Sequence, residues 1–163
     1  MTNAKLSYAE LDAELASRST GELLQLLDSP SIKVGDTATS LLGRRGALDI
    51  VYDALCGRRI RTALGRLRAL HALLLPARNY PKSFDACIQL LHDRSSVVFD
   101  EALWGLCLWC EPRCLPDLQR IADESNRGRI ALAIQAIQAG DYRIYSPYFD
   151  DRGDWAKSQS NVA

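Results

Sequence analysis

The amino-acid sequence predicts an all-α fold built from short helices. Leucine and alanine dominate the 163 residues while valine and isoleucine are modest, and this balance favours helices over strands. Ten glycines and six prolines punctuate segments that have a helical period. Residues 24–46 also match residues 88–110, which indicates an internal repeat. We expect one helical domain over residues 1–140 and a non-helical tail over 141–163.

Two capping boxes predict the first two helices. Ser7 with Glu10, and Ser19 with Glu22, place a hydroxyl and a carboxylate at the spacing at which each side chain can bond the backbone N–H of the other residue. The motif SPS that follows then interrupts the chain. The two helices are expected at about 8–16 and 21–28.

Glycines end the next two expected helices, and the fifth helix has the clearest apolar period. The motif GRRG at 43–46 closes a helix expected over 31–43, and Gly57 closes one expected over 47–56. The fifth helix, expected over 59–75, has a broad apolar stripe, and its opposite face is small and weakly polar. Such a helix can be covered on both sides. The stripe comprises Ile60, Ala63, Leu64, Leu67, Leu70, His71 and Leu74.

Four further helices follow the linker PARNYPKS at 76–83. Pro112 stops the second of them, because its ring removes a hydrogen-bond donor and clashes with the preceding turn. Gly140 is the expected C-cap of the last one. The four helices are expected at about 83–91, 95–110, 114–123 and 127–139.

The internal repeat pairs identical residue types at a constant spacing. One further helix pair lies between the two matching segments, so the sequence indicates a degenerate repeat of helix pairs. The matches pair Leu26 with Leu90, Leu27 with Leu91, Ser31 with Ser95, Val34 with Val98, Asp36 with Asp100, Ala38 with Ala102 and Leu42 with Leu106.

Residues 90–121 carry the whole repeat pattern. It consists of a leucine pair, a turn aspartate, a valine, an alanine four residues later and a proline at the entry to the second helix. With this stretch the chain resembles the HEAT-like repeat family, in its short bacterial, armadillo-type form, over about residues 20–139. The resemblance implies a right-handed α-solenoid of about four helix pairs whose second helices line a concave surface. The family usually has an arginine after the valine, whereas Gly35 and Phe99 stand there in this chain. The matching residues are Leu90, Leu91, Asp93, Val98, Ala102, Leu103, Leu106, Leu115, Pro116 and Leu118.

Three cysteines cluster at Cys107, Cys110 and Cys114, and two interpretations are open. A C-x-x-C pair binds zinc when a second pair or two histidines complete the four ligands. Here the other two cysteines and both histidines are scattered singly. The repeat places Cys107 and Cys110 opposite Gly43 and Gly46, where helices approach closely, and a buried cysteine packs as a small apolar residue. A redox dithiol would need a strand–turn–helix context that is absent here, so we expect packing residues and no metal or cofactor.

The charges are unevenly distributed, although 20 basic and 20 acidic residues cancel. The absence of net charge argues against a general nucleic-acid binder. Residues 44–78 nevertheless hold eight arginines against two aspartates. These arginines form either a solvated rim or an electropositive band for an acidic protein or a phosphate backbone. The band consists of Arg58, Arg59, Arg61, Arg66 and Arg68.

The tail mixes aromatic residues with aspartates and has no helical period. It is expected in part to cap the last helices and in part to be flexible, and its aromatic side chains are alternatively anchors for a protein partner. Polar residues of the second helices line the concave face if the family geometry holds. The expected partner-binding residues are Tyr52, Asp53, Asp85, Gln89, Asp117, Arg120, Tyr142, Tyr145, Tyr148, Asp150 and Asp151.

The sequence favours binding over catalysis. It has no nucleophile–base spacing, glycine-rich phosphate loop or paired-carboxylate motif. No apolar run reaches the roughly 20 residues that span a bilayer, and no signal peptide is expected after Met1. Five cysteines, an odd number, indicate a reducing cytoplasm.

We therefore expect a cytoplasmic, non-enzymatic protein-binding domain. Its most specific form is a bacterial immunity-type protein that neutralises a partner toxin. The first alternative is nucleic-acid binding, with a HEAT-like DNA glycosylase as the enzymatic extreme. The second is a lyase or chaperone for a small chromophore, which requires a cysteine or carboxylate exposed in a pocket.

Overall fold

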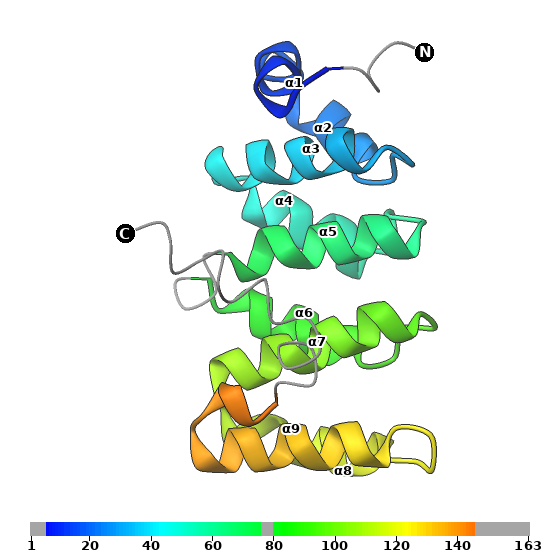
Figure 1. Cartoon of the computed structure of the whole chain (residues 1–163), viewed down its shortest axis with the longest axis vertical. Coiled ribbons are helices and arrows are strands. Elements are labelled where there is room, and N and C mark those ends of the chain that lie inside the picture. The colour runs from blue at the N-terminus through cyan, green and yellow to red at the C-terminus, as the bar shows by residue number, and fades with distance from the viewer. Residues whose placement is uncertain (1–5, 76–79, 146–163) are drawn as a thin grey trace. The chain divides into compact units, whose positions relative to one another are not determined.

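The computed structural model describes residues 6–75 and 80–145, and this part of the chain consists of helices without a strand (Figure 1). The prediction of an all-α protein is therefore confirmed. The elements are α1 (Tyr8–Leu15), α2 (Thr20–Leu26), α3 (Ile32–Arg44), α4 (Leu48–Cys56), α5 (Ala63–Leu74), α6 (Lys82–Leu90), α7 (Ser96–Trp109), the 3-10 turn η3 (Pro112–Cys114), α8 (Leu115–Ile121), α9 (Arg127–Ala139) and the 3-10 turn η4 (Tyr142–Ile144).

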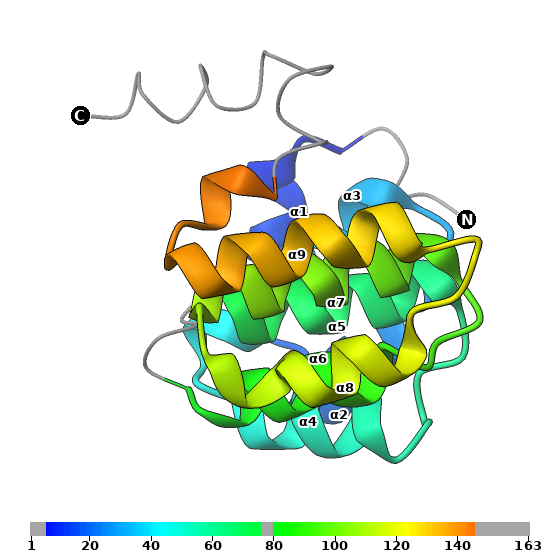
Figure 2. The same ribbon diagram turned by 90° about the horizontal axis from the view of Figure 1, so that it is seen from below.

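The chain divides into two compact units, Met1–Gly105 and Leu106–Ala163, and the boundary falls inside α7. In the first unit α3 packs against α1, α2 and α5, while α4 packs against α5 and α6. Figure 2 shows α1 and α3 on one side of this unit and α2 and α4 on the other. The first unit is therefore two layers of helices with the apolar core between them.

Local signals in the sequence fix several helix ends. Both predicted capping boxes form: the Ser7 N–H donates to Glu10 at 2.7 Å, and the Ser19 N–H donates to Glu22 at 2.9 Å. At the other end of the chain, Gly140 closes α9 in the left-handed conformation with φ 65°. These ends are set by neighbouring residues, which explains why the sequence predicts them well.

Helix α5 begins at Ala63, later than predicted, because the Asp28 carboxylate holds the preceding turn outside the helix. The backbone N–H groups of Arg61 and Thr62 each donate to this carboxylate at 2.9 Å. The Thr62 hydroxyl then accepts from the Gly65 N–H at 2.8 Å and caps the helix. Asp28 lies at the end of α2, so a contact between distant residues decides where α5 starts.

Helix α5 buries only part of the predicted apolar stripe, Leu70 and Leu74, and it also buries the small residues of the opposite face. Leu64 and His71 are exposed, and the His71 ring bonds the Glu101 carboxylate at 2.8 Å. The face that α5 buries is instead rich in small residues, because neighbouring helices approach it closely. A Cβ on Gly65 would collide with the Asp28 carboxylate. The buried residues are Gly65, Arg68, Ala69, Leu70, Ala72, Leu73 and Leu74.

The prediction of an exposed arginine band is wrong for Arg68, because only 2% of the surface of this residue is accessible. Its guanidinium donates to Asp36 at 3.1 Å and to four backbone carbonyls at 2.8–3.2 Å. The guanidinium also fills the space over Gly35, where a Cβ would overlap it. Arg68 thus fastens α5 to the turn between α2 and α3. The four carbonyls belong to Leu27, Ser29, Ser31 and Ile32.

The second unit is built around α9, which packs against α8 and η4. Tyr145 follows η4 and is only 1% exposed. The prediction that Tyr145 contacts a partner is therefore wrong, because its ring is already buried within the protein. Among the described residues, no helix combines the length and the apolar character needed to cross a membrane.

Candidate functional site

The structure brings four of the predicted partner-binding residues together on the first unit. Tyr52 and Asp53 lie on α4, Asp85 and Gln89 lie on α6, and the two helices pack against each other. Asp53, Asp85 and Gln89 are exposed, and Tyr52 is half-buried. Burial, and then the nearby Cys56, Asp85 and Asp53, raise the pKa of Tyr52. We call Tyr52, Asp53, Asp85 and Gln89 the α4–α6 face.

One end of the α4–α6 face carries an ion-pair cluster that the sequence does not predict. The Lys82 ammonium lies 2.7 Å from the Asp49 carboxylate and 5.5 Å from the centre of the Tyr52 ring. The Tyr80 hydroxyl donates to the same carboxylate at 2.9 Å. Hydrogen bonds from Lys82 and then Tyr80 lower the pKa of Asp49, while burial and then the bond to Asp49 raise that of Tyr80. The only local sequence signal for this cluster is that Tyr80 and Lys82 flank Pro81 at the start of α6.

The other end of the α4–α6 face opens into a hollow of about 1000 Å³ between the turn after α4 and the turn after α6. Its floor includes the buried side chains of Leu55, Ile60 and Leu90. Cys56 and Gln89 line it from the two helices. The hollow therefore continues directly from the α4–α6 face.

A partly buried ion pair forms part of the wall of the hollow. The Arg66 guanidinium donates to both oxygens of Asp93, at 2.6 and 2.9 Å, with side chains 17% and 8% exposed. Burial alone raises the pKa of Asp93, but the Arg66 guanidinium and the Ser95 N–H outweigh it and lower this pKa. In return, the hydrogen bond to Asp93 raises the pKa of Arg66. This pair joins α5 to the turn after α6.

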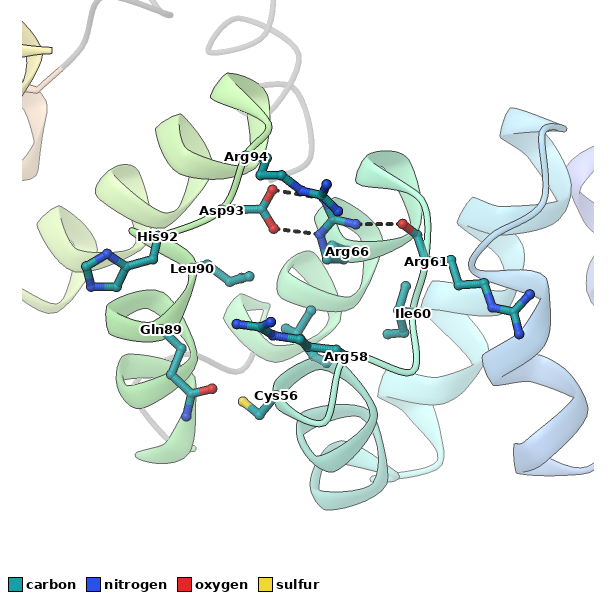
Figure 3. Close-up of a pocket in the computed structure, with 11 residues that line it drawn as sticks. Cys56, Arg58, Ile60, Arg61, Arg66, Gln89, Leu90, His92, Asp93 and Arg94 are labelled. Carbon is teal, nitrogen blue, oxygen red and sulfur yellow. Dashed lines mark hydrogen bonds and ion pairs between the residues drawn. The ribbon is translucent and has the colours of Figure 1, made fainter. Parts of the chain in front are cut away.

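Three cationic side chains lie around this pair with no partner of their own. Arg58, Arg61 and Arg94 are exposed, and their guanidinium groups make no hydrogen bond or ion pair within residues 6–75 and 80–145. Figure 3 shows that Arg58 extends across the hollow toward α6, that Arg94 lies beside Arg66, and that the Arg61 side chain points away. His92 adds an exposed imidazole to the lining.

The predicted basic band therefore separates into three environments. Arg58, Arg59 and Arg61 are exposed, Arg66 is half-buried in its ion pair, and Arg68 is buried. Arg94 lies outside the predicted basic band and lines the hollow together with Arg58. It does so because the turn after α6 lies beside the turn after α4, and no local sequence pattern indicates this contact.

The remaining predicted residues lie on the second unit or outside the described part of the chain. On α8 the Arg120 guanidinium pairs with Asp117 at 3.0 Å, one turn apart. Tyr142 is 40% exposed. Tyr148, Asp150 and Asp151 lie outside the described residues.

The thiols of the cysteine cluster donate hydrogen bonds to backbone carbonyls. Burial raises the pKa of Cys107, and it raises that of Cys114 to about 11. The Cys114 thiol donates to the Glu111 carbonyl at 3.1 Å, and the Cys110 thiol to the Cys107 carbonyl at 2.9 Å. Cys110 itself takes φ 49° and ends α7 just before Pro112. Metal ligation requires thiolates. Residues 6–75 and 80–145 contain no group of three or more histidine, cysteine or acidic side chains arranged to hold a metal ion.

Comparison with protein-family models, with curated proteins and with solved structures gives no match.

Proposed function

We propose that this chain is a non-enzymatic protein-binding module of the α-solenoid type, a right-handed stack of HEAT-like helix pairs that binds its partner through the α4–α6 face. Repeat proteins of this architecture present one layer of helices as an extended binding surface. In its most specific form the proposal is an immunity-type protein that sequesters a toxin. The observation that carries the binding role is the aromatic and acidic α4–α6 face beside a hollow.

Links between successive helix pairs support the repeat. Ser31 and Thr62 cap α3 and α5 in the same way, and Ser95 precedes α7 at the corresponding place. Aligned by these caps, Arg66 stands where Gly35 and Phe99 stand in the other two pairs. Arg66 therefore stands at the position where the family pattern has an arginine, although Gly65 and not a valine precedes it, and it binds Asp93 in the turn of the next pair. Asp28 joins the first pair to the second in a similar way.

The composition of the α4–α6 face supports a protein partner. Tyrosine supplies a large contact area with little loss of side-chain entropy, and it is enriched at the energetic centres of interfaces. Asp53 and Asp85 are exposed and form no ion pair within the described residues, so both carboxylates are available. A face with an aromatic centre and free charges suits a partner with complementary charges.

The shifted pKa values near this face arise from ion pairs that join helices. Those of Asp49 and Asp93 are lowered by Lys82 and Arg66, which join α4 to α6 and α5 to the turn after α6. Shifts with such causes are expected of structural ion pairs as well as of active sites. Their side chains are engaged in holding helices together.

The chromophore alternative calls for a cysteine or a carboxylate exposed in a pocket, and Cys56 is the cysteine that lines the hollow. Covalent attachment to a cysteine needs a thiolate. Burial raises the pKa of Cys56, and the Asp53 and Asp85 carboxylates raise it further, against the lowering effect of the Tyr52 hydrogen bond. The thiol is therefore kept protonated at neutral pH, and we do not propose a lyase.

Affinity capture of proteins from the source cells tests the proposed function. The wild-type chain is expected to retain one partner in stoichiometric amounts, and Asp53→Lys to reduce its recovery at least tenfold. Glu124→Lys makes the same charge change at an exposed position of the other unit and is expected to retain the partner. A captured protein that is toxic when produced without this chain supports the immunity form. Equal recovery by both variants, or no stoichiometric partner, contradicts the proposal.

A further inference from the structure

We propose that the hollow receives acidic side chains of a peptide segment that also carries a basic residue. This inference rests on the proposed protein-binding function and specifies the chemistry of the partner. The segment places one or more carboxylates at Arg58 and Arg94 and a lysine or arginine over Asp53 and Asp85.

The first support is the pair of unused guanidinium groups. Arg58 and Arg94 come from two different turns, and both line the hollow without an ion pair to any described residue. Arg66 at the wall is already neutralised by Asp93. A carboxylate between Arg58 and Arg94 can receive charge-assisted hydrogen bonds from both sides, and such bonds are stronger than those between neutral groups.

The second support is the backbone of Arg58, which is strained. Its φ of 55° lies in the left-handed region, at the place after a helix where glycine is usual. A side chain in this region costs about 1–2 kcal/mol relative to the right-handed region. The conformation directs the Arg58 side chain across the hollow toward α6 (Figure 3). An arginine in a position that favours glycine indicates that the side chain has a use there.

The third support is the apolar floor. Leu55, Ile60 and Leu90 are between 3% and 8% exposed and line the same hollow as the cations. Charges that approach each other above apolar side chains are less screened by water than on an open surface. The methylene groups of a glutamate can pack on this floor while its carboxylate reaches the arginines.

The order of charges along the α4–α6 face favours a peptide over a nucleic acid. Asp53 precedes Cys56 by one turn on α4, and Asp85 precedes Gln89 by one turn on α6, so the carboxylates lie about 5 Å from the hollow along the helices. A strand with a phosphate at every nucleotide would meet these carboxylates and be repelled. A peptide can place an acidic residue in the hollow and a basic residue opposite Asp53 and Asp85.

Nuclear magnetic resonance titration of the full ¹⁵N-labelled chain tests this proposal. The main probe is the twelve-residue peptide (Glu-Glu-Gly-Lys)₃, compared at equal ionic strength with oligo-glutamate, oligo-dT of twelve nucleotides and inorganic phosphate. We expect the mixed peptide to bind most tightly and to shift the amide signals of Arg58, Gln89, His92 and Arg94.

Two matched double variants assign the binding to the hollow. Arg58→Gln with Arg94→Gln is expected to weaken the peptide at least fivefold. Arg59→Gln with Arg127→Gln removes the same charge from exposed positions outside the hollow and is expected to change affinity less than twofold. Arg58→Gly serves as a second variant, because it relieves the backbone strain and is expected to weaken the peptide at an equal or higher melting temperature.

Several results would overturn the inference. They are equal weakening by both double variants, tighter binding of oligo-dT than of the peptide, and phosphate that binds as tightly as the peptide and displaces it. The proposed function fails separately. Partner capture that depends on Asp53 but not on Arg58 and Arg94 removes only this inference, whereas peptide binding without any captured partner removes only the proposed function.

Discussion

At the scale of single residues, two arginines on neighbouring elements have opposite roles. The guanidinium N–H groups of Arg68 donate hydrogen bonds inside the protein, to Asp36 and to backbone carbonyls of the turn between α2 and α3. The Arg58 guanidinium donates no hydrogen bond to a described residue, and the Arg58 backbone is strained. Stability is therefore expected to depend on Arg68, and binding on Arg58.

Arg68→Met is expected to destabilise the chain by about 3 kcal/mol, because it removes a buried cation and leaves backbone carbonyls without a donor. Urea denaturation followed by circular dichroism measures the change. Arg59→Met, at an exposed position, is the control and is expected to cost less than about 0.5 kcal/mol. A loss of similar size in both variants contradicts the structural role of Arg68.

Arg58→Gly is expected to raise the free energy of unfolding by about 1 kcal/mol, since glycine adopts a φ of 55° without steric cost. The gain is reduced by the greater freedom of glycine in the unfolded chain. Thermal and urea unfolding both measure it. A variant less stable than the wild type would show that the Arg58 side chain supports the fold rather than binding.

At the scale of elements, carboxylates fasten successive helix pairs. Asp28 ties the end of α2 to the turn before α5, and Asp93 ties the turn after α6 to α5. Both are partly buried, which raises their pKa values, but the hydrogen bonds that they accept outweigh burial and lower them.

The lowered pKa values predict acid sensitivity. A carboxyl with a lower pKa in the folded state stabilises the protein above its unfolded value of 3.8, and this stabilisation is lost as the pH falls further. The free energy of unfolding is therefore expected to be level near neutral pH and to fall between about pH 5 and pH 2. Asp28→Asn should flatten this fall. Urea titrations at a series of pH values measure it, and an identical slope in the variant would exclude Asp28 as a contributor.

At the scale of the whole molecule, the sequence predicts those structural features that depend on residues close together in the chain. The capping boxes at Ser7 and Ser19 and the terminal Gly140 depend on local spacing, and the structure reproduces them. The buried face of α5, the burial of Arg68 and the cluster at Asp49 depend on residues about thirty or more positions apart. Hydrophobic periodicity describes the buried surface of α5 only in part, because glycine and alanine are buried there beside leucines where helices pack closely.

The candidate site divides in the same way. Tyr52, Asp53, Asp85 and Gln89 are predictable because a regular order of helix pairs places α4 and α6 in one layer. The hollow is not predictable from sequence, because it arises where two turns meet. One of these turns contains Arg58 in the left-handed backbone conformation. Arg94 is missing from the predicted band for this reason.

The central claim is that the α4–α6 face contacts a protein partner, and site-specific photocrosslinking in the source cells tests it most directly. A photoreactive amino acid replaces Gln89 on α6 in one variant and Ser40, an exposed residue of α3, in the other. We expect one discrete crosslinked protein from position 89 and none from position 40. Crosslinking from position 40 alone, or equally from both positions, would contradict the claim.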